Sequence, residues 1–153
     1  MPKLDLTAIP STNRTTYPEP YAAGMTKRSF RRLGAAGGLT DFGISHVTVE
    51  PGGMSSQRHW HSDVDEFLVM LEGEAVLVEE GGETMLRPGD CAAFPKGAAN
   101  GHHIVNRSAE PCVFLAFGRS EGDCHYPDAD LHWDSANNCY TRKDGTPYAA
   151  GVS

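Results

Sequence analysis

The chain lacks the features that mark several large classes of protein. It has no apolar run long enough to cross a membrane, and Met1 to Asp5 carry no signal-peptide core. The net charge of −7 disfavours nucleic acid as the main partner, because phosphate contacts require a basic surface. The sequence therefore predicts a soluble cytoplasmic protein without a membrane or nucleic-acid partner.

Cysteine pairs with metal-binding or redox spacing are also missing. The four cysteines, Cys91, Cys112, Cys124 and Cys139, show no CxxC pattern. Because no secretion signal precedes them, we expect reduced thiols rather than disulfides. Cys124 and Cys139 flank a possible hairpin, which leaves a pairing between them as the alternative.

Turn-forming residues, by contrast, are frequent. Seventeen glycines and ten prolines divide 153 residues, which suits one domain of many short strands joined by tight turns. Strand-like patterns cover residues 39–50, 67–71, 74–80, 83–86, 91–94 and 112–117. We therefore predict an all-β fold, a sandwich or barrel.

Two histidines on one strand are the strongest chemical signal. His59 and His61 are separated by one residue, so their side chains lie on the same side of a strand. Glu66 follows five residues later and can return to that side after a short bend. Two imidazoles and a carboxylate at one point predict a divalent-metal site that lacks one more nitrogen ligand. Gln57 shares this side and is a candidate pocket donor, or else makes a structural hydrogen bond.

Glycines and prolines at fixed spacing accompany these ligands and supply a resemblance to a known family. The first segment contains Gly53, His59-x-His61, Glu66 and Gly73, and the second contains Gly89, Pro95-x-Gly97, His102 and Asn106. Together the two segments resemble the paired motifs of the cupin superfamily. The first motif fits at every position. In the second, four residues separate Gly97 from His102, where the family has two.

The resemblance implies both a fold and a ligand set. It predicts a cupin jelly-roll, or double-stranded β-helix, barrel over residues 39–118, with an N-terminal arm (1–38) and a C-terminal extension (119–153) packed on the barrel. The tail is similar to that of small bacterial single-domain cupins. The implied metal ligands are His59, His61, Glu66 and His102. The offset to Asn106 selects His102, and His103 stays the alternative.

These four ligands would hold one divalent ion, Fe, Mn, Ni, Co or Zn, with two positions open in octahedral geometry. The first hypothesis is a metal-dependent enzyme, such as a dioxygenase, isomerase, lyase or decarboxylase, acting on a small oxygenated metabolite. The sequence offers no clear acid or base beside the metal. A non-catalytic protein that binds or senses a sugar or acid in the same pocket is therefore the alternative.

Three further patterns concern partners. Residues 67–71 and 112–117 are apolar at nearly every position, so both faces of those strands need cover; a homodimer or the N-terminal arm could supply it. The basic cluster 27–33 predicts a solvated face, with an anionic ligand as the alternative. His125 with Asp128 and Asp130 more simply caps the barrel than binds a second metal.

Overall fold

Three antiparallel sheets make up most of the regular structure in the computed structural model, which describes residues 3–119 and 122–149. The largest has the strand order β1-β2-β9-β4-β7, the second β6-β5-β8 and the third β12-β11-β10-β3. The strands are β1 (Arg28–Arg32), β2 (Gly43–Val49), β3 (Trp60–His61), β4 (Glu66–Glu72), β5 (Ala75–Glu79), β6 (Gly82–Leu86), β7 (Cys91–Phe94), β8 (His103–Val105), β9 (Cys112–Gly118), β10 (Cys124–Tyr126), β11 (Leu131–Asp134) and β12 (Cys139–Thr141). The helices are the short α1 (Leu33–Ala36) and the 3-10 turns η1 (Leu6–Ala8) and η2 (Tyr21–Met25). The predicted all-β fold is confirmed.

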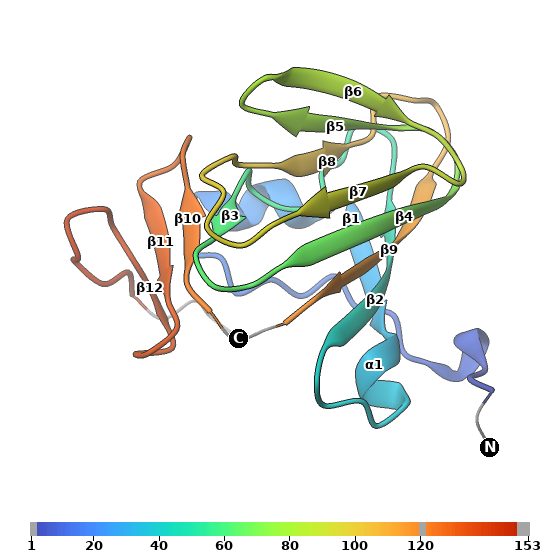
Figure 1. Ribbon diagram of the computed structural model, residues 1–153, viewed down its shortest axis with the longest axis horizontal. Helices are drawn as coiled ribbons and strands as arrows, with labels where there is room; N and C mark the ends of the chain where they lie inside the picture. Colours follow the sequence, from blue (N-terminus) through green and yellow to red (C-terminus); the bar gives the residue numbers. More distant parts are fainter. Residues whose placement is uncertain (1–2, 120–121, 150–153) are drawn as a thin grey trace.

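The first two sheets face each other and enclose the main core (Figure 1). Inward side chains alternate along each strand, as the two-residue period of a strand requires. The buried core comprises Val47, Val49, Leu68, Met70, Ala75, Leu77, Leu86, Ile104, Cys112 and Phe114. These residues come from both sheets and form one core between them.

Gly73 allows the tight turn between β4 and β5. Its φ is +72°, a left-handed conformation that side chains disfavour. A Cβ atom there would also lie 2.5 Å from the carbonyl oxygen of Pro111. Both constraints account for glycine at this position.

The N-terminal segment contributes more to the barrel than a separate arm would. Residues 28–32 form β1, the edge strand of the largest sheet, in register with β2 from Arg28–Val49 to Arg32–Ser45. Thr12 adds one more bridge to Phe30. β1 thus lies in the largest sheet within the predicted N-terminal arm, and Thr12 pairs with it at the edge of that sheet.

The C-terminal segment builds the third sheet beside the barrel, drawn in orange and red in Figure 1. β10 pairs with β3 through Cys124–His61 and His125–Trp60. Its small core, Cys124, Tyr126 and Leu131, also receives tyrosines from the N-terminal segment, Tyr17 and Tyr21. Tyr17 and Tyr21 thus pack on the C-terminal sheet, which pairs with the strand that carries His61.

No helix among the described residues is long and apolar enough to span a membrane. All four cysteines are unpaired in the structure, and only Cys91 is exposed.

Candidate metal centre

Backbone pairing brings the two histidine segments together. The amide of His59 donates to the carbonyl of His102 (3.1 Å), and the amide of His102 donates to that of His59 (2.8 Å). Residues that exchange both bonds lie directly opposite each other in an antiparallel pair, with their side chains on the same face. This places His102, from the end of one motif, beside His59 from the other.

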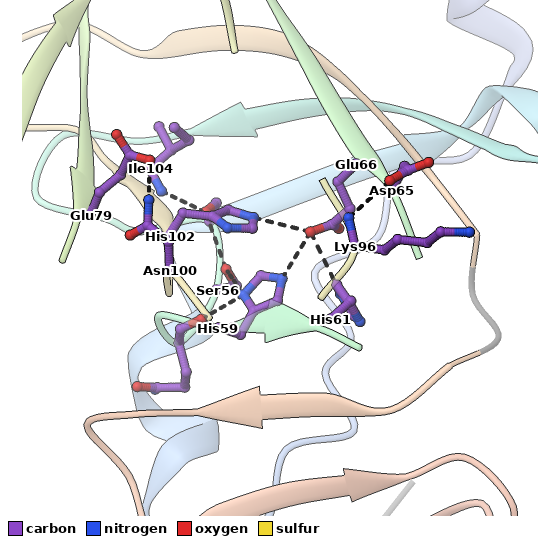
Figure 2. Close-up of polar contacts among 12 residues, drawn as sticks. Ser56, His59, His61, Asp65, Glu66, Glu79, Lys96, Asn100, His102 and Ile104 are labelled. Carbon is purple, nitrogen blue, oxygen red and sulfur yellow. Dashed lines mark hydrogen bonds and ion pairs between the residues drawn. The ribbon is translucent and has the colours of Figure 1, made fainter. Parts of the chain in front are cut away.

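The Glu66 carboxylate is the point on which three imidazoles converge (Figure 2). Its Oε2 atom lies 3.0 Å from Nε2 of His102 and 3.5 Å from Nε2 of both His59 and His61. Glu66 begins β4, and the other three residues come from β3 or the segments that border β3 and β8. The structure therefore brings all four predicted ligands to one place.

The contacts of the Nδ1 atoms determine which nitrogen of each imidazole is free to bind a metal ion. Nδ1 of His59 lies 2.9 Å from the carbonyl oxygen of Gln57, and Nδ1 of His61 lies 3.1 Å from that of Asp123. A nitrogen that faces a carbonyl oxygen must carry the proton, so Nε2 of each ring keeps its lone pair. These contacts orient both rings with their acceptor atoms toward Glu66.

The charge state of the centre also suits a cation. Burial acts to raise the pKa of the Glu66 carboxyl, but hydrogen bonds from His102, His59 and His61, made when Nε2 carries a proton, outweigh it and hold that pKa far below its usual range. Burial lowers the pKa of His102, against the opposing effect of Glu66. Burial also acts to lower the pKa of His61, but there Glu66 outweighs it and raises that pKa, so a bound metal ion would replace a proton on that ring. An ionised carboxylate beside a neutral imidazole is the form in which these groups bind metals.

The spacing of the ligand atoms fits a divalent ion. Two ligand atoms at about 2.1 Å from an ion and at right angles are about 3.0 Å apart, close to the separations of 3.0 and 3.5 Å from Glu66. Without a cation or a proton, lone pairs and a carboxylate at these distances repel one another. The cluster of His59, Glu66 and His102 could therefore hold a metal ion, with His61 beside it.

A cavity of about 260 Å³ opens at this cluster. Its walls include His59, Glu66 and His102 at one side and Phe30, Val47 and Phe114 from the barrel interior. Pockets that enclose small ligands are mostly apolar with a few convergent polar groups, as here. The cavity admits a small metabolite to the cluster.

Asn106, the last residue of the second motif, stabilises the backbone near the metal centre through hydrogen bonds. It is almost fully buried, and its amide nitrogen donates to the carbonyls of Val49 and Glu110, each at 2.8 Å. Its side-chain oxygen accepts bonds from Ser108. These bonds fix the loop that follows β8 and hence the strand adjoining His102.

Three sequence candidates lie away from the cluster. Gln57 is not in the cavity wall: its amide donates to the carbonyl of Tyr21 (3.1 Å), because the chain bends before β3 begins. His103 turns its Nδ1 to the carbonyl of Ser56 (3.0 Å) rather than to Glu66. His125 stacks on Trp60, with ring centroids 4.1 Å apart.

Asp128 forms a two-bond ion pair with Arg58 (2.6 and 2.7 Å) and joins the extension to the barrel. His125, Asp128 and Asp130 form no potential metal cluster within the described chain. The capping interpretation of this segment agrees with these contacts.

Cys124 is the neighbour that sequence patterns did not identify. It is buried on β10, and its sulfur belongs to a group with His59 and His61 whose ligand atoms all lie within 4.8 Å of one another. Burial raises the pKa of its thiol strongly, which keeps the group neutral in the absence of a metal. Only the pairing of β10 with β3 brings it here, and no local spacing reveals that pairing.

The fold and this arrangement of ligands define a cupin, and comparisons with known proteins agree. The family model of the cupin domain matches residues 45–118. The chain is 46% identical to a sugar phosphate isomerase from a cupin superfamily of Silicibacter pomeroyi, over 97% of this chain and 98% of that one, with a TM-score of 0.91. The chain therefore belongs to the cupin superfamily.

Other solved structures are more distant. A protein from Acidithiobacillus ferrooxidans, described as a candidate sugar phosphate isomerase, is 30% identical over 79% of this chain and 74% of that one (TM-score 0.66). The polyketide cyclase RemF from Streptomyces resistomycificus is 22% identical over 80% and 81% of the two chains (TM-score 0.66) and shows the fold alone. A search of curated protein sequences finds no match.

Proposed function

We propose that this cupin is a divalent-metal-dependent isomerase that acts on a phosphorylated sugar or a closely related small oxygenated metabolite. The observation that carries the proposal is the convergence of three Nε2 atoms on the Glu66 carboxylate at a cavity of about 260 Å³. The similarity to the Silicibacter pomeroyi protein supports an isomerase over a dioxygenase or lyase.

The residues of the metal centre and its surroundings have different proposed roles. His59, His61, His102 and Glu66 would hold the ion, and a bound divalent ion would supply a Lewis acid that polarises a carbonyl or lowers the pKa of a hydroxyl. The carbonyls of Gln57 and Asp123 keep the His59 and His61 rings in place. Phe30, Val47 and Phe114 give the cavity a water-poor wall, which strengthens each electrostatic contact inside.

Exchange of hydrogen with solvent tests the proposal. Protein loaded in turn with Mn²⁺, Fe²⁺, Co²⁺, Ni²⁺ or Zn²⁺ is mixed with aldose and ketose phosphates in D₂O and followed by NMR. We expect interconversion or deuterium incorporation next to the carbonyl with at least one metal, lost in His59→Ala and retained in the control His132→Ala. Binding without any turnover by every metal form would contradict catalysis and favour the non-catalytic binder.

We also propose that the outer face of the largest sheet is a homodimer interface. Phe67 and Leu71 of β4 are each 39% exposed there, and the Phe67 ring contacts Phe117 of β9. The N-terminal segment lies along β1 and against the C-terminal sheet, so it does not supply the expected cover. A second copy of the chain fits an apolar face that a lone subunit leaves in water.

A further inference from the structure

Strand β1 directs two arginines into the cavity of the metal centre. Arg28 pairs with Val49 and Arg32 pairs with Ser45, with Phe30 opposite Val47 between them. Directly paired residues share a face of the sheet, and Val47 and Val49 belong to the core. Arg28, Phe30 and Arg32 therefore point inward, and all three line the same cavity as His59 and Glu66.

Nothing in the described structure neutralises these two charges. None of the ion pairs between described residues involves Arg28 or Arg32. Arg28 donates only to backbone carbonyls, those of Ser55 (2.9 Å) and Arg14 (3.2 Å), and its buried Nε has no hydrogen-bond partner. A charged group that is partly buried without a counter-ion is costly and calls for an explanation.

The two arginines also act on each other. Both guanidinium groups lie over the ring of Phe30, at 5.1 and 5.2 Å from its centroid. Burial lowers the pKa of Arg28, and the charge of Arg32 adds to that effect, with Tyr17 and Tyr140 opposing it. The strand thus holds the positive charges of Arg28 and Arg32 close to the same ring, that of Phe30. An anion bound between the two guanidinium groups would relieve their repulsion.

We propose that Arg28 and Arg32 form the subsite for the phosphate group of the substrate, with the metal centre receiving the carbonyl end. A dianionic phosphate matches two guanidinium groups in charge and in donor geometry. Arg28, Arg32, His59 and Glu66 line one cavity, so a single small ligand there can contact both the arginines and the metal centre. This inference rests on the proposed function.

Binding of inorganic phosphate to the metal-loaded protein, measured by calorimetry, tests the subsite. Arg32→Met removes an exposed charge that makes no hydrogen bond to another described residue, whereas Arg28→Lys keeps the charge of the half-buried Arg28 and removes the fork. The matched control is Arg31→Met on the same strand, because Arg31 faces the other side and donates to the carbonyl of Ile9. We expect about tenfold weaker phosphate binding or more in the two test variants and an unchanged affinity in the control.

Further arms separate this proposal from the proposed function. His59→Ala removes a metal ligand, and phosphate binding that depends on the arginines persists in it. Loss of phosphate binding in His59→Ala but not in Arg32→Met would place the anion on the metal and overturn the subsite. Acetate that binds as tightly as phosphate would overturn the assignment to a phosphate. Arginine-dependent phosphate binding by a protein that holds no metal would support the subsite and contradict the proposed function.

Discussion

Phe94 lies face to face with His102, with ring centroids 3.6 Å apart and ring planes 6° from parallel. Phe94 also pairs in register with Glu66, so one aromatic ring borders two of the four predicted ligands. The ring of His102 is held by the face of Phe94 and by the contact of its Nε2 with Glu66 (3.0 Å). His59 and His61 are held instead by backbone carbonyls at Nδ1.

Replacing this ring should weaken metal binding. In Phe94→Leu the imidazole of His102 gains freedom to rotate, and we expect about tenfold lower metal affinity, the lower end for loss of a group that orients a ligand. A competition titration with a coloured chelator measures it. Phe42→Leu, at an exposed ring just before β2, is the control and should keep the affinity of the parent. Equal affinity in both variants would show that His102 needs no aromatic support.

The ion pair between Arg58 and Asp128 should stabilise the attachment of the C-terminal sheet. The Arg58 side chain is only 12% exposed, and it also contacts Glu80 (2.8 Å). Because both carboxylates face water, we expect Arg58→Met to lower the free energy of unfolding by about 1–2 kcal/mol. Urea denaturation measures this loss. Arg107→Met, which breaks an exposed pair with Glu83, should leave the urea midpoint close to that of the parent.

Low pH should remove the stabilisation that the ion pair between Arg58 and Asp128 provides. The hydrogen bond from Arg58 lowers the pKa of Asp128 below its ordinary value of 3.8, with burial opposing it. A carboxyl group whose pKa is lower in the folded protein than in the unfolded protein stabilises the fold at pH values above the unfolded pKa. This stabilisation is lost as the pH falls through the pKa of the folded state. The stability gap between the parent and Arg58→Met should thus be constant at neutral pH and shrink below 3.8. A gap that persists in acid would mean that Arg58 acts through packing alone.

Charge on the outer face of β4 should separate the proposed dimer. We expect Leu71→Glu and Phe67→Glu to be monomers in size-exclusion chromatography with light scattering, because a buried unpaired carboxylate opposes association. Met85→Glu is the control, since Met85 is 44% exposed on a different sheet. A parent protein that is monomeric at high concentration would contradict the interface.

Local patterns predicted the barrel and the residues that meet in it. Strand-like patterns located β2 and β5, and continuous apolar runs located β4 and β9, to within a few residues. The fixed spacing from His59 to Glu66 depends only on one strand and one bend. β1 was not predicted because its arginines resemble a solvated basic run. Only the pairing with β2 shows that Arg28 and Arg32 point inward. Gln57 makes a structural hydrogen bond, the alternative that the sequence left open, because β3 comprises only Trp60–His61 and the chain bends before it.

Long-range pairing also explains why the second motif was harder to read. Two extra residues before His102 left His102 and His103 as alternatives in the sequence. The backbone bonds between His102 and His59 decide which side chain faces Glu66 in the fold, and no local pattern contains them. Likewise, Cys124 lies beside the His59–His61 pair only because β10 pairs with β3. Cys124 and its pairing partner His61 are more than sixty residues apart in the sequence (124 and 61).

Metal content is the most direct test of the centre on which this account depends. Parent protein, His102→Ala and His103→Ala are purified without chelator, and bound metal per chain is determined by elemental analysis. We expect close to one divalent ion per chain in the parent and in His103→Ala, and a large loss in His102→Ala. Full metal content in His102→Ala, or a loss confined to His103→Ala, would contradict the assignment of the four ligands.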